Sequence, residues 1–499
     1  METVNDKTES RIVRLQSIYS LICLNSYILK ELLNKKTPFM SVFEDFLNNI
    51  LLFIQTDDEK FQLISINFIL FFIEKFTSDS SFYQIKEMML PLIDELVRIL
   101  LLFLESNMND NNKIKVKQKA IDFFEYILIN YSNVLANSLN FKQFIVFLQK
   151  QSLKIKVEDL ENKMIYVYLI QLIPYLLENL FHLCVNDTNG NNNYLLNLLN
   201  HIQNLMIKTY KDLLNGIENS CIHDLIPNIT DLLNSIIKFS LKNRYNNEKF
   251  FCMINDDRVY ESLLFYGQRT QVLMNKFFQY IAELARIPRM PLIDSHLEEI
   301  LIYLVEFFKS FKDPDEIFIN LETNFIISNA IYALGNIGLN YNDYRFRSYC
   351  AYIIELILVY FKNNTTQEIG ENLIYTLGKL SLIFPDIVIH YFKDFLKCYF
   401  TCFRILKVCD SEDKFLSLKG IVEAFMLEKN KLLPYFCELS LALISYDELP
   451  SLFKNIYTRL YTHYLECCPE KLADIINSLK DQEKCEIEQK LLNTNGNTY

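Results

Sequence analysis

The sequence contains no tryptophan and few of the residues that form tight turns. Its 499 residues include 9 Gly and 11 Pro. Sandwiches, barrels and propellers need many tight turns, so this scarcity excludes those classes. Neither a G-x-G-x-x-G nor a G-x-x-x-x-G-K-[ST] motif occurs, which argues against the common phosphate-binding loops. We therefore expect an all-α protein.

Motifs for catalysis and for metal binding are also missing. The six histidines are spread along the chain without an H-E-x-x-H motif, and no G-x-S-x-G elbow is present. The twelve cysteines include no C-x-x-C pair. Cys398 and Cys402 lie four residues apart with only His390 nearby, a pattern that favours buried thiols over zinc ligands. We predict a protein that is not an enzyme and that holds no cofactor or metal.

The balance of charge is acidic. Fifty Lys and Arg residues against 61 Asp and Glu residues give a net charge of −11. Proteins that bind nucleic acid broadly carry a basic face, so the charge argues against nucleic acid and favours a basic partner. Residues 1–10 (METVNDKTES) lack the apolar segment of a secretion signal, and the cysteines are scattered. Both features predict a reducing compartment and no secretion.

The most apolar stretch is MIYVYLIQLIPYLLENLFHLCV (164–185). Gln171, Pro174, Glu178 and Asn179 interrupt it. A membrane-spanning helix needs about 20 predominantly apolar residues, and proline inside a helix kinks or breaks it. We therefore predict a buried helix pair broken at Pro174, and no membrane insertion.

Three of the scarce glycines are evenly spaced. Gly335, Gly378 and Gly420 follow one another at intervals of 43 and 42 residues. The first two lie in matching segments, NAIYALGNI (329–337) and NLIYTLGKL (372–380). A period in the low forties is typical of HEAT or armadillo repeats. The prediction is an α-solenoid of HEAT-type helical hairpins, with room for about eleven repeats.

Helices are predicted at two per period around these glycines. A hairpin between two neighbours buries more than one face, which accounts for a hydrophobic content of 51%. Glycine inside a helix costs about 1 kcal/mol relative to alanine, so we predict a close helix crossing at Gly335 and at Gly378. The predicted helices are LEEILIYLVEFFKSF (297–311), FIISNAIYALGNIGL (325–339), YRFRSYCAYIIELILVYFK (344–362), IGENLIYTLGKLSLIF (369–384) and DIVIHYFKDFLKCYFTCFRIL (386–406).

Two of these helices carry tyrosine at the same place on one face. Two interpretations stay open, because such a tyrosine can pack half-buried between repeats or can contact a ligand. The residues of this face are Ser328, Tyr332 and Asn336, followed one repeat later by Glu371, Tyr375 and Lys379.

Asparagine-rich segments mark the boundaries between helices. Residues 106–113 (SNMNDNNK) and 186–193 (NDTNGNNN) are expected to be flexible loops, and residues 493–499 a frayed tail. No independent second domain is expected.

Some of the repeated segments resemble the transportins of the importin-β superfamily of nuclear transport receptors. SNAIYALGNIGL (328–339) is similar to the transportin stretch N-N-A-T-W-A-I-G-E-I. GENLIYTLGKLSLIFP (370–385) is similar to L-E-N-T-A-I-T-I-G-R-L with its downstream proline. After Arg404, SEDKFLSLKGI (411–421) resembles N-E-E-K-D-S-A-F-R-G-I. Order and spacing both follow the family.

The resemblance weakens towards the N-terminus. TDLLNSI (230–236) and FFQYIAELAR (277–286) resemble two earlier transportin helices. The organisation that this implies is a disordered N-terminus (1–10), divergent HEAT-like repeats (11–194), transportin-like C-terminal HEAT repeats that form a cargo arch (195–468), and a terminal helix with a disordered tail (469–499).

The resemblance implies a concave, acidic and aromatic surface that holds an extended signal with basic residues and a Pro-Tyr pair. Carboxylates attract Arg and Lys, and aromatic faces pack against guanidinium groups. Asp231 and Glu283 match acidic cargo-contact positions of the family, and Tyr332 matches a cargo-contacting tryptophan. Ordinary solvated charges for the two acids and a packing role for Tyr332 stay open. The other predicted cargo-binding residues are Asn336, Glu371 and Tyr375.

The function that the resemblance implies is nuclear import, with the protein in cytoplasm and nucleus and at the nuclear pore. The implied partners are cargo proteins with nuclear localisation signals and nucleoporins with Phe-Gly repeats. The family's tryptophans are absent here, and Asn336 replaces the Glu that follows the glycine of its motif. The N-terminal arch that binds the GTPase Ran is not recognised, so Ran as a partner stays open. The alternative function is a HEAT-repeat scaffold or regulatory subunit of a multiprotein assembly, such as a phosphatase complex.

Overall fold

The computed structural model describes most of the chain from residue 51 onwards. The described residues are 13, 51–52, 54–55, 58–77, 83–107, 113–154, 165–185, 194–215, 222–245, 247–310, 321–362, 366–405, 412–446 and 448–492. The predicted disordered N-terminus, the loop at 186–193 and the tail at 493–499 lie outside these residues, as does most of the loop at 106–113.

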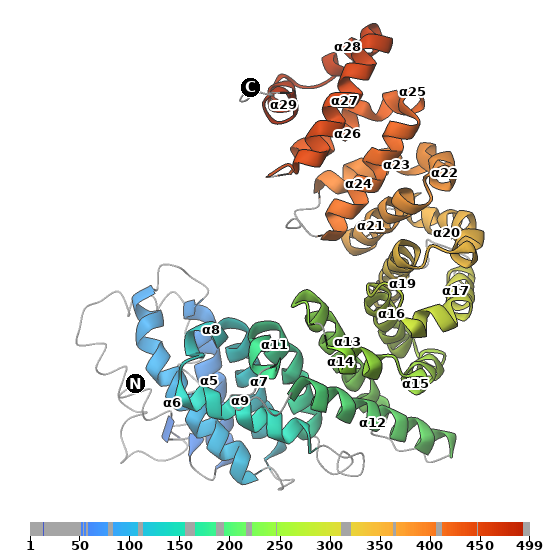
Figure 1. Cartoon of the computed structure of the whole chain (residues 1–499). Helices are drawn as coiled ribbons and strands as arrows, with labels where there is room; N and C mark the ends of the chain where they lie inside the picture. Colours follow the sequence, from blue (N-terminus) through green and yellow to red (C-terminus); the bar gives the residue numbers. More distant parts are fainter. Residues whose placement is uncertain are drawn as a thin grey trace. The chain divides into compact units, whose positions relative to one another are not determined.

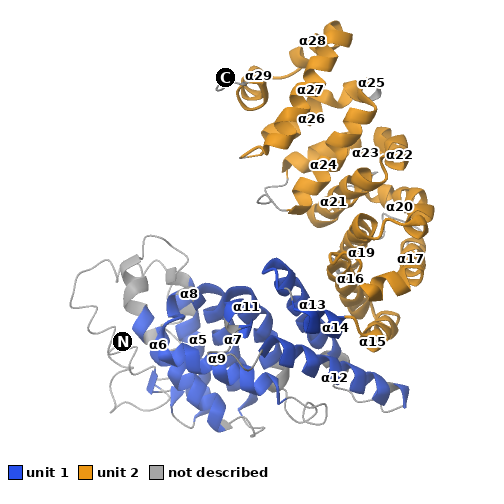
Figure 2. Cartoon of the chain, viewed as in Figure 1, with its two compact units in different colours: residues 1–254 blue, residues 255–499 orange. Residues whose placement is uncertain are grey.

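The chain forms two compact units, residues 1–254 and residues 255–499 (Figure 2). Every regular element in the described residues is a helix, which confirms the predicted all-α class. The boundary between the units falls inside the segment 195–468 that the resemblance defined. The assignment of 195–468 to a cargo arch stays a prediction.

Unit 1 consists of helices that pack against one another (Figure 1). Its elements are α5 (Glu59–Thr77), α6 (Tyr83–Asn107), α7 (Ile114–Asn130), α8 (Ser132–Leu135), α9 (Leu139–Ser152), α11 (Ile165–Val185), α12 (Tyr194–Leu214), α13 (Ile222–Lys242) and α14 (Glu248–Ile254).

Unit 2 continues the same pattern from residue 255. Its first elements are α15 (Asp257–Gly267), α16 (Gln271–Ala285), α17 (Pro291–Ser310), α19 (Leu321–Asn340), α20 (Tyr344–Lys362), α21 (Gln367–Ile383), α22 (Pro385–Val388), η2 (Ile389–Tyr391) and α23 (Phe392–Ile405). The remaining elements are α24 (Glu412–Leu427), α25 (Lys429–Leu432), η3 (Leu433–Tyr435), α26 (Phe436–Ile444), α27 (Ser451–Cys467), α28 (Pro469–Asn477), α29 (Asp481–Ile487) and η4 (Glu488–Leu492).

The helices of each unit lie in two rows. In unit 2 the A row is α17, α20, α23 and α26, and the B row is α16, α19, α21 and α24, with each helix packed on the next of its own row. In unit 1, α5, α7, α11 and α13 form the corresponding B row. Two stacked helices per repeat are the HEAT-type architecture that the sequence predicts. The total of about eleven repeats stays a prediction, because residues 14–50 lie outside the described part.

Polar side chains fix the start of the helices that open unit 2. The Asp256 carboxylate caps α15 by accepting from the backbone N–H of Arg258 at 3.0 Å, and the Thr270 hydroxyl caps α16 by accepting from the N–H of Leu273 at 3.3 Å. Such a cap stabilises a helix by about 1 kcal/mol. The cap at Thr270 also sets the register of α16, and with it the direction of the side chains near its C-terminal end.

Two helix boundaries differ from the prediction. Helix α11 runs through Pro174 and is interrupted at Leu180, with φ −135° and ψ 34°, so the predicted helix pair is present but its break lies at Leu180 and not at Pro174. Packing of α11 between α7 and α13 holds the helix together across the missing N–H of the proline. The single helix predicted over 386–406 is divided into α22, η2 and α23.

Within the described residues, no single helix is long and apolar enough to cross a membrane. One bent pair passes by length and composition alone, Gln367–Ile383 with Pro385–Ile405, whose two parts meet at 116°.

Gly335 and Gly378 lie at helix crossings, as predicted, and Gly420 lies at one as well. An ideal Cβ on Gly335 would lie 2.9 Å from Cα of Thr376, and one on Gly378 would overlap Ser417. A Cβ on Gly420 would overlap the carbonyl oxygen of Gly378. The three glycines therefore let α19, α21 and α24 approach backbone to backbone, which compensates for the low helix propensity of glycine.

Hydroxyl groups bond across the same crossings. Thr376 donates to the carbonyl of Ile331 on α19 at 2.7 Å, and Ser417 donates to the carbonyl of Ile374 on α21, also at 2.7 Å. In both cases the accepting carbonyl lies four residues before the glycine. The repeated arrangement fixes the offset between neighbouring B-row helices and places their polar side chains in register.

Candidate functional site

The B row of unit 2 carries a group of polar side chains that connects four successive helices. We call this group the polar cluster. It consists of Glu283 on α16 and Arg286 directly after that helix, Tyr332 and Asn336 on α19, Lys379 on α21, and Asp413 on α24.

Lys379 is the centre of the polar cluster. Its ammonium group lies 2.6 Å from Oδ1 of Asp413 and donates to Oδ1 of Asn336, also at 2.6 Å. The face of the Tyr332 ring covers the same ammonium at 4.8 Å from the ring centroid. Only 1% of the Lys379 side chain is exposed. Burial lowers the pKa of Lys379, and attraction to Asp413 opposes that shift.

Asp413 is shared between two donors. Its Oδ2 accepts a hydrogen bond of 2.7 Å from the phenol of Tyr332, while Oδ1 faces Lys379. Burial acts to raise the pKa of Asp413, but the charge and hydrogen bond of Lys379 outweigh it and the pKa is lowered. Burial beside this carboxylate raises the pKa of the Tyr332 phenol. At neutral pH the cluster therefore contains a carboxylate and a neutral phenol.

Arg286 and Glu283 form the edge of the cluster at the C-terminal end of α16. Their side chains pair at 3.1 Å, with 32% of Arg286 and 14% of Glu283 exposed. Burial acts to lower the pKa of Arg286, but the neighbouring groups of Tyr332, Glu283 and Asp413 raise it overall. Asn336 ties α19 to α16 by donating to the carbonyl of Ala282 at 3.1 Å. The cluster thus extends without a break from α16 to α24.

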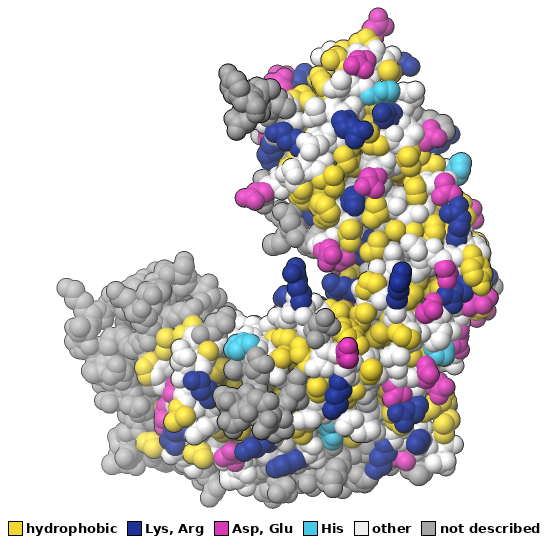
Figure 3. All heavy atoms as spheres, viewed as in Figure 1, with side chains coloured by type: hydrophobic (Ala, Val, Ile, Leu, Met, Phe, Trp, Pro, Cys, Tyr) yellow, Lys and Arg dark blue, Asp and Glu magenta, His cyan; other side chains and the backbone are white. Residues whose placement is uncertain are grey.

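The charges of the polar cluster balance. Two carboxylates, Glu283 and Asp413, face two cations, Arg286 and Lys379. In the view of Figure 3, acidic and basic side chains are also interspersed over the visible face of unit 2. The polar cluster itself is therefore neutral overall.

The structure brings three of the predicted site residues together in the polar cluster, Glu283, Tyr332 and Asn336. Asn336 is only 1% exposed and Tyr375 only 7%, so neither presents a contact surface to a cargo. Glu371 is half-buried and accepts from the side-chain amide of Gln367 at 2.9 Å.

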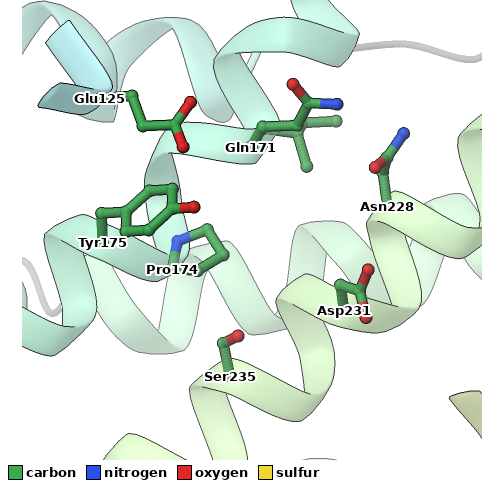
Figure 4. A pocket seen from close by; sticks show the side chains of 8 residues that line it. Glu125, Gln171, Pro174, Tyr175, Asn228, Asp231 and Ser235 are labelled. Atoms are coloured by element: carbon green, nitrogen blue, oxygen red, sulfur yellow. The ribbon is translucent and has the colours of Figure 1, made fainter. Parts of the chain in front are cut away.

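Asp231 lies in the other unit, on α13. It is half-buried and lines a pocket together with residues of α7 and α11 (Figure 4). It is the one predicted site residue that belongs to unit 1, and it forms no part of the polar cluster.

The sequence analysis missed three members of the polar cluster as site residues. Arg286, Lys379 and Asp413 each lie in a segment that resembles transportin, and Lys379 shares the tyrosine-bearing face of its helix. The signal was a basic residue on a buried helix face, which requires an acidic partner nearby. The partner of Lys379 lies 34 residues further on, across a helix crossing that the spacing alone does not define.

No group of three or more His, Cys, Asp or Glu side chains within the described ranges is arranged to hold a metal ion. Cys398 is exposed and Cys402 is half-buried, on α23.

No protein-family model matches the chain, and no curated protein matches it. Among solved structures, it is similar to an engineered protein with 12% identity and a TM-score of 0.43, over 89% of this chain and 98% of that chain. It is also similar to Kap121p bound to Nup53p, with 14% identity and a TM-score of 0.35, over 97% of this chain and 47% of that chain. A third similar structure is yeast importin-beta (Kap95p), with 12% identity and a TM-score of 0.43, over 97% of this chain and 67% of that chain.

The chain spans less than half the length of the Kap121p structure. At these identities and TM-scores, the similarities carry no argument about function.

Proposed function

We propose that the chain is a nuclear import receptor of transportin type, which binds extended basic signals containing a Pro-Tyr pair along the B row of unit 2. The supporting observation concerns four segments that resemble consecutive transportin segments, 277–286, 328–339, 370–385 and 411–421. Most of their residues belong to α16, α19, α21 and α24, and these helices pack side by side in that order. A row of adjacent helices is the arrangement that an extended peptide needs in order to contact each of them in turn.

Three of the predicted cargo-contact residues on this row, Glu283, Tyr332 and Glu371, are half-buried and so are partly accessible. Glu283 is paired with Arg286, the residue that follows its helix, and a basic residue of a bound segment competes with that partner for the carboxylate. The Tyr332 ring offers an aromatic edge beside it. Because the cluster is neutral, it attracts a basic segment over a distance less strongly than an acidic surface would.

As a receptor, the protein moves between cytoplasm and nucleus through the nuclear pore. Its partners are cargo proteins with nuclear localisation signals and nucleoporins with Phe-Gly repeats. We recognise no Ran-binding arch in the sequence of unit 1. The experiment below therefore measures whether Ran-GTP releases the cargo.

The neutral polar cluster favours a second function. A buried network that joins four helices stiffens the row, and stiffness suits a HEAT-repeat scaffold or the regulatory subunit of a multiprotein assembly. A scaffold binds folded partners and ignores a free signal peptide.

Titration with a peptide separates the two functions. We would follow the fluorescence anisotropy of a labelled basic peptide with a Pro-Tyr pair as the full-length protein is added, with and without Ran-GTP. A peptide with Ala-Ala in place of Pro-Tyr tests sequence specificity. Saturable binding that needs the Pro-Tyr pair is expected of a receptor, and no saturable binding would remove the proposal in favour of the scaffold.

Matched variants locate the binding surface. Tyr332→Ala and Glu283→Gln are expected to weaken peptide binding. The controls are Tyr352→Ala on α20 and Glu298→Gln on α17, which make the same chemical changes on the A row at more exposed side chains. Equal affinities in all four variants would place the peptide elsewhere on the protein.

A further inference from the structure

A cysteine, a histidine and an asparagine lie next to one another where α25 faces the C-terminal part of α27 (Figure 1). The Sγ atom of Cys467 lies 3.7 Å from Nδ1 of His463, one turn earlier on α27. The other ring nitrogen of His463, Nε2, lies 3.4 Å from Oδ1 of Asn430 on α25. The three side chains therefore connect a thiol to an imidazole and the imidazole to an amide, and none of them belongs to the polar cluster.

The fold holds Asn430 beside His463. Tyr464, the residue after His463, is fully buried, and its hydroxyl donates to the carbonyl of Lys429 at 2.7 Å. The Tyr464 ring also packs edge-on against Phe436, with the ring centroids 5.0 Å apart. These contacts tie α27 to the residue before Asn430, so the amide lies next to the imidazole.

The neighbours of His463 determine how its ring can be used. The amide oxygen of Asn430 only accepts, so Nε2 carries the proton of the neutral imidazole and Nδ1 presents a lone pair to the Cys467 thiol. An imidazole in this tautomer can take the thiol proton, and the imidazolium then stabilises the thiolate beside it. The C-terminal end of a helix carries a partial negative charge, so α27 itself does not favour an anion at Cys467. The thiolate depends on His463.

The Cys467 side chain is exposed, so a reagent in solution can reach its sulfur. Three other described cysteines are also exposed, Cys252 on α14, Cys398 on α23 and Cys485 on α29. Among the cysteines that the structure describes, only Cys467 lies within hydrogen-bond distance of an imidazole. Exposure combined with a neighbouring base is the environment of a reactive cysteine.

We propose that Cys467 is a modification site for low-molecular-weight disulfides such as glutathione disulfide, with His463 as its base and Asn430 as a positioning residue. The thiol proton moves to Nδ1 of His463, and the Cys467 thiolate attacks one sulfur of the disulfide. A new S–S bond forms to Cys467 while the S–S bond of the reagent breaks, and the leaving thiolate takes the proton from His463. The protein thiol is oxidised and the reagent is reduced to one thiol, so no other oxidant is needed. The site is separate from the proposed transport function, because it requires no bound peptide.

Peptide mass spectrometry measures the reaction at each cysteine separately. We would treat the full-length protein at neutral pH with dithiodipyridine, a small uncharged disulfide, and follow the adducts over time. An ordinary thiol is only a few per cent ionised at this pH, so Cys467 is expected to react about tenfold faster than Cys252, Cys398 and Cys485. Glutathione disulfide should also modify Cys467 first. Equal rates at the four exposed cysteines would overturn the proposal.

Matched variants test the base. His463→Gln removes the imidazole and should bring the rate at Cys467 down to that of the other exposed cysteines. His182→Gln, at an exposed histidine on α11, is the control and should leave the rate at Cys467 unchanged. Circular dichroism spectra show whether each variant is folded. A folded His463→Gln protein with the wild-type rate at Cys467 would overturn the proposal.

Two substitutions at Asn430 test the positioning role. Asn430→Ala should slow the reaction of Cys467 severalfold, because Nε2 loses the acceptor that fixes the tautomer. Asn430→Asp should restore the rate, since a carboxylate accepts the same hydrogen bond and also stabilises the imidazolium. A loss of packing alone would not be rescued in this way. Wild-type rates in both variants would remove Asn430 from the site.

Discussion

The phenol of Tyr332 donates a hydrogen bond of 2.7 Å to Oδ2 of Asp413, 81 residues later in the sequence. The other oxygen of that carboxylate faces Lys379 at 2.6 Å, and the Lys379 ammonium lies over the Tyr332 ring. Side chains from α19, α21 and α24 therefore form a closed triangle in which each contacts the other two. Removing any one of them leaves a polar group of the others without its partner, and this makes the triangle testable by substitution.

Tyr332→Phe removes only the hydroxyl group. Asp413 then keeps Lys379 and loses one donor, and the ring stays in place over the ammonium. A hydrogen bond to a charged group is worth about 2 kcal/mol, so we expect a loss of stability of that order, seen as a lower urea midpoint of the full chain by circular dichroism. Tyr344→Phe is the control, since Tyr344 is 81% exposed on α20 and should show no change. Equal midpoints for both variants would mean that the Tyr332 hydroxyl contributes nothing to the fold.

Lys379→Met removes the cation from the centre of the polar cluster. Methionine keeps most of the buried length, but Asp413 then lies largely buried without its counter-charge. Breaking a buried ion pair on one side costs about 3 to 5 kcal/mol; we expect about 3 kcal/mol because the Asp413 side chain is 24% exposed.

The double variant Lys379→Met/Asp413→Asn provides the control for this effect. Asparagine at 413 still accepts from Tyr332 and needs no cation, so much of the lost stability should return. A double variant that is less stable than Lys379→Met would contradict the ion-pair explanation. Urea denaturation of the wild type, Lys379→Met, Asp413→Asn and the double variant measures how much of the lost stability returns.

The stability of unit 2 should depend on pH through Asp413. Its folded-state pKa is lowered from 3.8, so the folded state favours the carboxylate. The stabilisation is fully present above pH 3.8, and it is lost as the pH falls through the lower folded-state pKa, because the unfolded chain binds the proton first.

Thermal unfolding between pH 6 and pH 2 tests this dependence. The wild type should lose more stability over that range than Asp413→Asn, which has no carboxyl group at this position to protonate. Parallel pH profiles for the two proteins would show that the pKa of Asp413 is the same in the folded and unfolded chains.

Much of the fold could be predicted from the sequence because its signals are local or periodic. The spacing of Gly335, Gly378 and Gly420 predicted the repeat length, and the low helix propensity of glycine predicted the crossings at the first two. Helix 344–362 was predicted with the bounds that the structure shows. The prediction at Pro174 was wrong because the effect of a proline on its helix depends on the neighbouring helices. Packing against α7 and α13 is a tertiary property that the local sequence does not contain.

The candidate site could be predicted only in part. The repeat register placed Tyr332 and Lys379 on equivalent faces of their helices, but it left open which residues of the next helix they meet. The contact with Asp413 depends on the offset between α21 and α24, and that offset is set by the close approach at Gly378 and Gly420. The pairing of Lys379 with Asp413 follows from this offset, so the sequence analysis did not assign it.

Gly420→Ala tests whether this offset holds the site together. A Cβ on Gly420 would overlap the carbonyl oxygen of Gly378 and lie 2.8 Å from the backbone nitrogen of Leu382, so α21 and α24 must separate. Alanine gains about 1 kcal/mol over glycine in a helix, but we expect overpacking against backbone to outweigh it and to destabilise the protein by about 2 kcal/mol net.

Gly267→Ala is the matched control for this substitution, because its Cβ would meet the Phe277 side chain at 3.3 Å, where a small shift suffices. Its thermal midpoint should stay close to that of the wild type. If Gly420→Ala is as stable as Gly267→Ala, the two helices can separate without loss. In that case the contact between Lys379 and Asp413 does not depend on the glycine spacing, and the repeat period cannot be what positions the polar cluster.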